Sequence, residues 1–431
     1  RHDGLTRRGF LRLGSVATLA VALPQIVPQS VLGRNGLIPP SERVTMGFIG
    51  IGGQGGGHLL GGAWTYVAGG YAGRKDVQVL AVCDVWKDRR ERAKAQVNAK
   101  YTEVYGPGHP ICEAYTDFRH VLARNDIDAV LIATPAHWHA TMAVLAAEAG
   151  KDIYCEKPTA VTIRESQHVL RAVRRYGRVY QAGTQQRSEY GGKFLRACGL
   201  IRNGAIGHLR EIYAYRDGGA VLWTRKFGPP QPVPEALDWN LYLGPAPMFP
   251  FDGNTGAHRF DVGELNWGQH HYDFVQWAAG ADDTGPVEIW LEDGCSCYRY
   301  ASGVKVFGRG YPNEPIGGEG GACFVGTKGR IAVDRSALIS DPPEIAHARF
   351  PAGVRLYHSI SHSGNFLDSV RTRRKTICNE AVAHRSASAL LLGGVAKLLG
   401  RKLRWDPDKE QFIADEEANR MLSLAKRAPL G

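Results

Sequence analysis

The chain has 431 residues, of which 44% are hydrophobic, and a net charge of +11 at pH 7. This length allows two domains with sizeable cores, and the apolar fraction is typical of a globular protein. The basic residues are scattered and no nucleic-acid-binding motif occurs, so we expect a solvated basic surface and no nucleic-acid partner. Such a surface would still attract an anionic cofactor or an acidic glycan.

Residues 1–42 are expected to be a leader and a linker. Consecutive arginines followed by Gly-Phe-Leu in residues 6–12 are typical of a twin-arginine export signal. The apolar stretch over residues 13–27 is too short for a membrane span and is interrupted by Gly14 and Pro24. The leader therefore predicts an exported, periplasmic or extracytoplasmic protein without stable membrane insertion; the alternative is a disordered basic tail.

A glycine-rich turn follows the first apolar run. Residues 44–49 have strand length, and Gly50, Gly52 and Gly55 follow in the G-x-G-x-x-G spacing. The first glycine permits a tight turn, the second lets backbone approach a pyrophosphate, and the third lets a helix pack closely on the sheet. The motif alone also fits a turn without a ligand. The residues expected to bind a dinucleotide here are Gly50, Ile51, Gly52, Gln54 and Gly55.

The second predicted strand, residues 77–82, ends at Asp84. An acidic residue at this strand end hydrogen-bonds the adenosine ribose hydroxyls and disfavours a 2′-phosphate, although Asp84 could also cap the following helix. The interval from the glycines exceeds the usual ~20 residues, which we attribute to an enlarged helix within residues 56–73. We expect NAD as the cofactor; NADP stays possible because Arg89 and Arg90 follow closely.

Two further strands are predicted over residues 128–133 and 152–155, with a helix over 141–149 between them. Open parallel sheets place ligands beyond the carboxyl ends of their strands. The second of these strands delivers Glu156 and Lys157 to that edge. The residues after the first strand that we expect at the nicotinamide end of the cofactor are Thr134, Pro135 and His139.

The glycine turn, the acidic strand end, TPAHWHA and then CEKP, in that order, resemble the Gfo/Idh/MocA oxidoreductase family, which includes glucose–fructose oxidoreductase and inositol dehydrogenase. The resemblance covers nearly the whole chain after the leader, including TQQR at 184–187 and GTKG at 326–329. It implies an α/β protein with an N-terminal Rossmann dinucleotide-binding domain, residues 43–159. A C-terminal α+β domain, residues 160–431, would bind substrate and form a homo-oligomer through a large, mostly antiparallel open sheet.

Lys157 is the expected proton carrier. An ammonium beside the positive nicotinamide ring would be partly desolvated and repelled, so its pKa should fall and it could exchange a proton with a sugar hydroxyl. Glu156 would anchor this loop or the cofactor; the alternative for both residues is an exposed ion pair at a turn.

A helix predicted over residues 263–280 places Asn266, His270 and Asp273 on one face. In the family, the matching helix carries an Asp four residues before a His that acts with the EKP lysine. His270 matches the His, whereas Asn266 replaces the Asp, and an amide cannot take a proton. The resemblance thus implies Lys157 and His270 as catalytic residues. The predicted substrate-binding residues are Asn266, Gln185, Arg187, Trp223 and Asp273.

The remaining elements belong to the second domain. Residues 180–184 and 210–216 are predicted as strands of its sheet, and short alternating runs between 287 and 333 as its antiparallel strands. Residues 227–253 are proline-rich and predict an irregular covering loop, whose aromatic side chains either stack on sugar or pack locally. Helices are predicted over 362–368 and 381–399.

Eight cysteines are dispersed along the chain without a C-x-x-C pair or zinc-ligand spacing. We expect buried free thiols, with one disulfide left open, and no metal site, because adjacent histidines on one helix chelate poorly.

The expected activity is hydride transfer from a C–OH group of a sugar or polyol to a tightly bound NAD, with Lys157 and His270 handling the proton. An exported enzyme is expected to retain its cofactor, because free NAD is scarce outside the cytoplasm. One alternative is an NAD-dependent glycoside hydrolase acting by transient oxidation, elimination and re-reduction. Another is a non-catalytic, cofactor-bound sugar-binding protein, which Asn266 favours. The sugar and the carbon that reacts are left open.

Overall fold

The computed structural model describes residues 38–62, 65–107, 109, 112–223, 227–256, 259–349 and 353–427. Backbone contacts divide the chain into two units, residues 1–43 and 44–431. Most of the predicted leader, residues 1–37, lies outside the described residues. In the first unit the described residues include one 3-10 turn, η1 (Pro40–Glu42).

The second unit contains a six-stranded parallel sheet in the order β3-β2-β1-β4-β5-β6. Its strands are near-continuous apolar runs because helices cover both faces of the sheet. The strand order reverses between β1 and β4, which opens a crevice at the carboxyl ends of the strands. The predicted Rossmann fold is confirmed. The strands are β1 (Val44–Ile49), β2 (Val77–Cys83), β3 (Glu113–Tyr115), β4 (Ala129–Ile132), β5 (Asp152–Cys155) and β6 (Tyr180–Ala182).

Two sets of helices cover this sheet and form separate apolar clusters with its two faces. On one face lie α2 (Gly53–Leu60), α3 (Lys87–Tyr105) and α11 (His362–Thr372). On the other lie α4 (Phe118–Leu122), α5 (Ala136–Glu148) and α6 (Ile163–Arg175). Because α11 comes from the last quarter of the chain, the C-terminal part of the sequence helps to bury the first sheet.

The loop after the glycine turn differs from the prediction. The expected long helix within residues 56–73 ends at Leu60, and a loop with a 3-10 turn, η2 (Tyr71–Gly73), follows. Gly61, Gly69 and Gly70 have φ angles of +101°, +68° and +68°, which a continuing α-helix excludes. The long interval before Asp84 therefore arises from a loop and not from an enlarged helix.

Two other predictions are wrong. Helix α5 begins at Ala136 and not at residue 141, so the histidines of the TPAHWHA motif lie in its first turns. Strand β6 pairs in parallel with β5, so residues 180–182 belong to the first sheet and not to the second. The parallel sheet accordingly continues past residue 159.

The second sheet has nine strands in the order β15-β14-β13-β7-β12-β11-β10-β16-β17. Neighbouring strands are antiparallel except β7 and β12, which confirms the predicted, mostly antiparallel sheet. Its strands are β7 (Leu209–Tyr213), β10 (Pro286–Glu292), β11 (Cys295–Tyr300), β12 (Lys305–Phe307), β13 (Ala322–Gly326), β14 (Arg330–Val333), β15 (Leu338–Asp341), β16 (Leu403–Asp406) and β17 (Gln411–Phe412).

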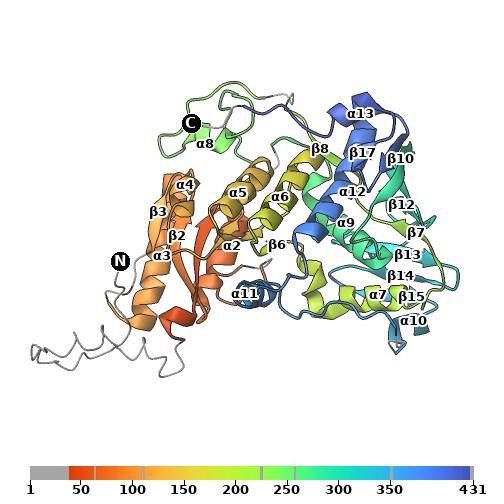
Figure 1. Cartoon of the computed structure of the whole chain (residues 1–431), viewed down its shortest axis with the longest axis horizontal. Helices are drawn as coiled ribbons and strands as arrows, with labels where there is room; N and C mark the ends of the chain where they lie inside the picture. Colours follow the sequence, from red (N-terminus) through yellow and green to blue (C-terminus); the bar gives the residue numbers. More distant parts are fainter. Residues whose placement is uncertain are drawn as a thin grey trace, which may run out of the picture. The chain divides into compact units, whose positions relative to one another are not determined.

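Three helices pack against this sheet, α7 (Lys193–Arg202), α9 (Leu265–Ala279) and α12 (Glu380–Leu399) (Figure 1). Helix α12 also packs on α6 and α9, with Leu390, Leu391 and Val395 buried, so it joins the two sheets through one core. The smaller elements are η3 (Gln185–Arg187), η4 (Tyr190–Gly192), β8 (Gly219–Val221), α8 (Trp239–Leu243), β9 (Asp261–Gly263), α10 (Glu344–His347) and α13 (Glu416–Arg420).

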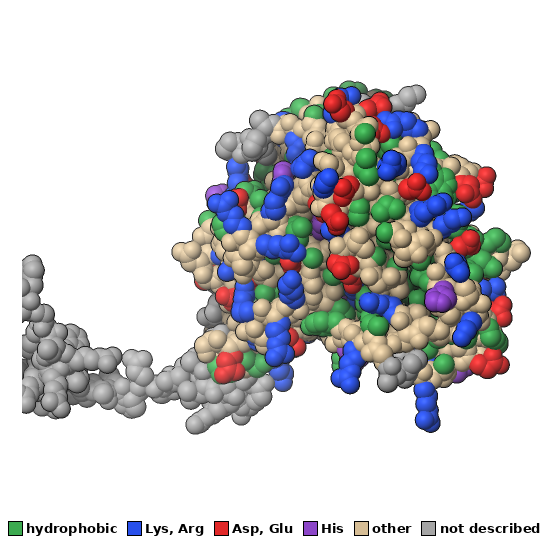
Figure 2. All heavy atoms as spheres, turned by 45° about the vertical axis from the view of Figure 1, so that its right-hand side comes forward, with side chains coloured by type: hydrophobic (Ala, Val, Ile, Leu, Met, Phe, Trp, Pro, Cys, Tyr) green, Lys and Arg blue, Asp and Glu red, His purple; other side chains and the backbone are tan. Residues whose placement is uncertain are grey.

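All eight cysteines are free thiols; seven are buried and Cys295 is half-buried. Figure 2 shows Lys and Arg side chains spread over the face in view, between Asp and Glu side chains. In the part of the chain that the structure describes, no helix has both the length and the hydropathy needed to cross a bilayer.

Candidate active site

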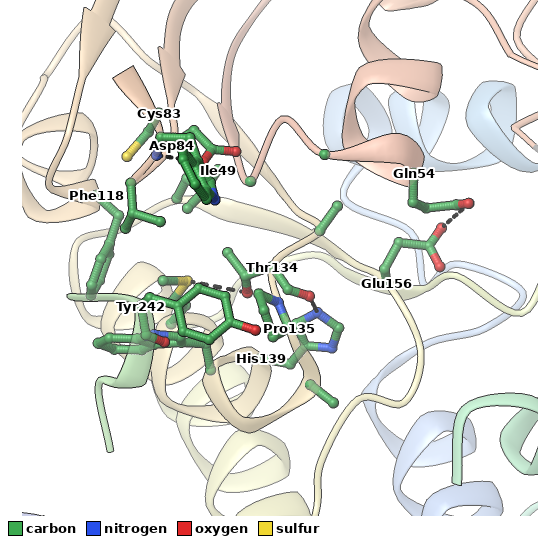
Figure 3. Close-up of a pocket in the computed structure, with 18 of the residues that line it drawn as sticks. Ile49, Gln54, Cys83, Asp84, Phe118, Thr134, Pro135, His139, Glu156 and Tyr242 are labelled. Atoms are coloured by element: carbon green, nitrogen blue, oxygen red, sulfur yellow. Dashed lines mark hydrogen bonds between the residues drawn. The ribbon is translucent and has the colours of Figure 1, made fainter. Parts of the chain in front are cut away.

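A cavity of about 480 Å³ lies at the carboxyl ends of β1, β2, β4 and β5 (Figure 3). A crevice at this edge, where the strand order reverses, is where doubly wound sheets bind dinucleotides. Ten residues predicted from the sequence line it: Gly50, Gly52, Gln54, Asp84, Thr134, Pro135, His139, Glu156, Lys157 and Asn266.

The glycine turn has the shape that a dinucleotide requires. Gly50 has a φ of +88°, and a Cβ there would lie 2.7 Å from the backbone carbonyl of Ala133. A Cβ on Gly55 would lie 1.8 Å from the Gly50 oxygen, so both positions exclude a side chain. At Gly53, the first residue of α2, a Cβ would meet nothing within 4 Å. The turn is thus closed against its own backbone and open at the start of the helix, which fits a pyrophosphate.

Asp84 ties the turn to the second strand. Its Oδ2 accepts a hydrogen bond of 2.7 Å from Ile51 N, and its Oδ1 accepts one of 2.9 Å from Trp86 N. Burial raises the pKa of Asp84, and these hydrogen bonds oppose the shift. The bond to Trp86 N lies before α3, whose N-cap residue is Trp86 and has no side-chain capping bond, so the helix-cap alternative for Asp84 is wrong. Asp84 also lines the cavity, next to Arg89.

Glu156 is buried and anchors the loop that carries Lys157. Its Oε1 lies 2.8 Å from His58 Nε2 and accepts bonds from Gln185 Nε2 at 3.0 Å and Gln54 Nε2 at 3.3 Å. Burial by itself would raise the pKa of this carboxyl, but the bond and charge of His58, together with Lys157 and Gln54, lower it to about 2. The alternative of an exposed ion pair is therefore wrong.

Lys157 meets the helix α9 across the cavity. Its Nζ donates a hydrogen bond of 2.7 Å to Asn266 Oδ1, and both residues line the cavity. Burial lowers the pKa of Lys157; Arg335 adds to this shift, while Glu156 and Asp261 oppose it. Because the amide of Asn266 is neutral, it accepts from the lysine without favouring the ammonium form as a carboxylate would.

A second contact fixes α9 against the same loop. Gln269 Oε1 accepts a hydrogen bond of 2.7 Å from Thr159 N, two residues after Lys157. Gln269 and His58 were not predicted as site residues, although both lie close to predicted ones: Gln269 is one turn from Asn266, and His58 follows the glycine turn.

His270 lies one turn after Asn266 and is 4% exposed. Burial holds the pKa of His270 well below its ordinary value, and Lys157 and Arg335 add to this effect. Its Nδ1 has no hydrogen-bond partner among the described residues. His270 is not among the cavity-lining residues of the described chain, but it is close enough to Lys157 for the two charges to interact. The adjacent His271 faces elsewhere, because its Nδ1 lies 2.7 Å from Gly321 O.

His139 is engaged with the backbone of the site. Its Nε2 lies 2.7 Å from Thr134 O and its Nδ1 lies 2.7 Å from Pro158 O. Burial lowers the pKa of His139, and these carbonyl contacts oppose the shift. The ring therefore joins the segment after β4 to the segment after β5, and its nitrogens are directed at the protein itself.

Two predicted substrate ligands form a buried ion pair instead. Arg187 Nε donates to Asp273 Oδ2 at 2.8 Å, and its Nη2 donates to Asp282 Oδ1 at 2.7 Å. The side chains of Arg187 and Asp273 are 2% and 0% exposed, and neither residue lines the cavity in the described chain. The prediction that they contact substrate is therefore wrong, because they neutralise each other between η3 and α9.

Gln185 and Trp223 also have other partners. Gln185 Nε2 bonds Glu156 and Tyr154 Oη, so it positions the Lys157 loop. Trp223 is 9% exposed, donates from Nε1 to Ala425 O at 2.8 Å, and packs in the core. The structure thus gives Gln185 and Trp223 partners within the protein, and not the direct substrate contact that was predicted. In the predicted covering loop, Tyr242 lines the cavity.

No group of three His, Cys, Asp or Glu side chains within the described ranges is arranged to hold a metal ion.

Residues 44–184 match the Gfo/Idh/MocA family model described as "Oxidoreductase family, NAD-binding Rossmann fold", and residues 219–431 match its "Oxidoreductase family, C-terminal alpha/beta domain". Over 219 residues the chain is 29% identical to a "Glycosyl hydrolase family 109 protein" of Shewanella baltica, a match covering 47% of this chain and 44% of that protein. This chain therefore spans less than half the length of the curated relatives it matches.

Many solved structures share the fold. The aldose-aldose oxidoreductase of Caulobacter crescentus, complexed with glycerol, has a TM-score of 0.54 and 17% identity, and the match covers 84% of this chain and 99% of that one. The WlbA dehydrogenase of Bordetella pertussis, in complex with NADH and UDP-GlcNAcA, has a TM-score of 0.55 and 16% identity, with the same coverage of 84% and 99%. The chain belongs to the Gfo/Idh/MocA oxidoreductase family, and its N-terminal part is an NAD-binding Rossmann domain.

Proposed function

We propose that this protein oxidises a C–OH group of a sugar, polyol or glycoside with NAD held in the 480 Å³ cavity, and that Lys157 accepts the hydroxyl proton. The observation that carries the proposal is the contact between Lys157 Nζ and the neutral amide of Asn266, 2.7 Å apart in the cavity wall. Burial disfavours the ammonium form of the lysine, and a neutral amine is the form that can act as a base.

The residues have separate tasks in this proposal. Bound NAD supplies the hydride acceptor. Gly50 to Gly55 and Asp84 hold its phosphates and ribose, while Glu156, fixed by three side chains, sets the position of Lys157. Asn266 Oδ1 orients the amine, and the neutral ring of His270, one turn further along α9, is the proposed next proton carrier.

A second candidate is glycoside cleavage through transient oxidation, and two observations favour it. The curated relatives are named as glycosyl hydrolases. Asp84 and Glu156 are the only carboxylates among the described residues that line the cavity, and both already accept hydrogen bonds from the protein. A hydrolase that uses two carboxylates directly is therefore a poor fit, whereas oxidation next to the leaving group would need none.

The proposal extends to export and to cofactor retention. A twin-arginine signal in residues 6–12 would carry the folded protein with its cofactor out of the cytoplasm. Changing both Arg7 and Arg8 to lysine is expected to leave the protein in the cytoplasmic fraction. Prolonged dialysis of the folded protein is expected to leave NAD bound; an empty, still-folded protein would refute retention. The second sheet is the proposed homo-oligomer interface, which the mass of the particle in solution tests.

The central experiment starts from protein purified without added nucleotide. Denaturation and chromatography identify the released nucleotide, and the folded protein is then offered free sugars, polyols and aryl glycosides. Release of the aryl group without added NAD would favour the glycosidase, whereas accumulation of an oxidised sugar would favour the oxidoreductase. No turnover, with sugar binding that Lys157→Met leaves unchanged, would show a binding protein instead.

A matched control separates catalysis from stability. Lys151 is a buried lysine at the other end of β5, where its Nζ donates to Ile127 O at 3.0 Å. Lys157→Met is expected to lower turnover by at least ~100-fold, the usual scale of general-base catalysis. Lys151→Met is expected to lower stability with turnover per folded molecule retained. Equal turnover of the two variants contradicts the role of Lys157.

A further inference from the structure

An aromatic–arginine cluster stands next to the Lys157–Asn266 contact. It consists of Tyr66, Tyr190, Trp267 and Arg335, which come from the loop after α2, from η4, from α9 and from the turn after β14. The guanidinium carbon of Arg335 lies 4.9 Å from the ring centre of Trp267 and 5.0 Å from that of Tyr190. The rings of Tyr66 and Tyr190 meet edge to face at 4.8 Å. Four segments distant in sequence thus form one cluster, in which the rings of Tyr190 and Trp267 contact the guanidinium of Arg335.

The cluster borders the proposed reaction site, and its four residues lie outside the set of described residues that line the 480 Å³ cavity. Trp267 follows Asn266 on α9, and its ring centre is 5.9 Å from that of His270. Arg335 is also close enough for its charge to lower the pKa of Lys157 and of His270, in each case after burial as the larger cause. A substrate that reacts at Lys157 and extends past Asn266 toward Trp267 would bring its far end to Arg335.

The backbone at two of the aromatic residues is strained. Tyr66 and Tyr190 have φ angles of +55° and +62°, a conformation that bulky side chains rarely adopt. Such strain persists only where the surroundings impose it, and it concentrates at ligand sites. Lys193 helps to impose it, because its Nζ donates to Tyr190 O at 3.2 Å and to Arg335 O at 3.3 Å.

Charges of both signs lie around the cluster, with Arg335, Arg216 and Lys157 as its cationic groups. The ring of Trp267 is also approached by Arg216, at 5.8 Å. Two carboxylates face the same region: Glu264 Oε2 lies 4.0 Å from Arg216 Nε, and Asp261 raises the pKa of Lys157. At the contact with Lys157 itself the helix offers the amide of Asn266, so no carboxylate from α9 occupies this position.

We infer that Arg335 binds a carboxylate of the substrate, so that the substrate class is a sugar acid such as a hexuronate; this inference rests on the proposed function. A guanidinium held against aromatic rings keeps its plane fixed, and its edge presents parallel N–H donors that match a carboxylate. Tyr190 and Trp267 are half-buried and Tyr66 is 37% exposed, so the cluster is accessible to a ligand from solvent. A phosphate group is also an anion, so a sugar phosphate is included in the test as the competing class of ligand.

The test measures binding to the NAD-loaded protein by calorimetry and does not depend on turnover. Three pairs of ligands differ only at C6: glucuronate and glucose, galacturonate and galactose, mannuronate and mannose. At least one acid is expected to bind about 10- to 150-fold more tightly than its neutral partner, the ratio that a hydrogen-bonded charge supplies. Arg335→Met is expected to bring that ratio close to one, and Arg335→Lys to restore part of it.

Arg309→Met is the matched control. Arg309 is also a half-buried arginine on an aromatic ring, 5.2 Å from the centre of Phe307, but it pairs with Glu292 and Asp293 away from the cluster. This variant is expected to keep the wild-type ratio. Equal binding of acid and neutral sugar by the wild type, or no binding of any acid, overturns the inference. Tighter binding of glucose 6-phosphate than of glucuronate overturns the assignment to sugar acids.

Turnover of the same ligands distinguishes the two proposals. If the wild-type protein binds the acids selectively but oxidises none of them, the inference about Arg335 stands and the proposed oxidation is rejected. If the protein oxidises neutral sugars and shows no preference for the acids, the proposed function stands and the role of Arg335 is rejected.

Discussion

Asn266→Asp is the substitution that best tests how the cavity controls Lys157. Asn266 Oδ1 accepts a hydrogen bond of 2.7 Å from Lys157 Nζ, so the variant places a carboxylate directly on the amine. The carboxylate stabilises the ammonium form, and the pKa of Lys157 must therefore rise. Since the base is the neutral amine, the acid limb of the pH profile of kcat/KM is expected to move to higher pH.

The size of this effect follows from the contact distance. Two unit charges 2.7 Å apart attract by about 6 kcal/mol at an effective dielectric constant of ~20. Burial of the new carboxylate costs several kcal/mol and offsets part of this attraction. A neighbouring opposite charge typically changes a pKa by about 1–3, so we expect the limb to move by about 1–3 pH units. Below the limb, activity should fall by about 10- to 1000-fold relative to the wild type.

The assay is steady-state oxidation of one sugar from pH 5 to 10, with NAD content measured for each sample. Asn313→Asp, which adds the same charge at an exposed position, serves as the control. An unchanged acid limb in Asn266→Asp, with full activity and bound NAD, would show that Lys157 is not the base. A limb that moves to lower pH would refute the electrostatic reasoning.

Three further outcomes are expected. Gly55→Ala should bind less NAD and have a Tm several degrees lower, because its Cβ would lie 1.8 Å from the carbonyl oxygen of Gly50. In the control Gly53→Ala the new Cβ meets nothing within 4 Å, so its stability should stay near that of the wild type. Glu156 has a folded pKa of about 2 against an ordinary value of 4.5, so its contribution to stability, about 3 kcal/mol, is present above pH 4.5 and is lost as the pH falls toward 2. Denaturant titrations between pH 6 and 3 should show this loss in the wild type and a smaller one in Glu156→Gln; equal slopes would contradict it. Arg187→Met should lower the free energy of unfolding by about 3–5 kcal/mol, because the buried carboxylate of Asp273 loses its counter-charge. An unchanged denaturation midpoint would argue against a stabilising role for this ion pair.

The sequence by itself identified the elements whose signals are local. The glycine spacing predicts a turn that excludes side chains at Gly50 and Gly55, because backbone packs against backbone there. Apolar runs ending in Asp84 and Glu156 predict parallel strands whose carboxyl ends meet at one edge, and these residues do line one cavity. Helical spacing predicts that Asn266 and His270 share a face of α9, as they do.

Local signals could not assign partners. Polar residues in family-like segments, such as Arg187 and Asp273, look the same in sequence whether they bind substrate or pair with each other in the core. The distinction depends on burial, which is decided by the packing of η3 against α9. Strand β6 was assigned to the wrong sheet for a similar reason: its three residues carry no signal for which neighbour they pair with.

The tertiary structure alone decided the chemistry around Lys157. The lysine and Asn266 are 109 residues apart in sequence, and their 2.7 Å contact depends on α9 being held against the loop after β5 by Gln269. Arg335 was not predicted as a site residue, because a single arginine after a strand does not form a motif. It gains its place only when the second sheet brings the turn after β14 beside α9. Sequence spacing thus determines the local structure and the side chains of each short segment. The packing of the two sheets through α9 and α12 determines which charged groups come into contact. The reason is that Coulomb energies and burial depend on distances in space.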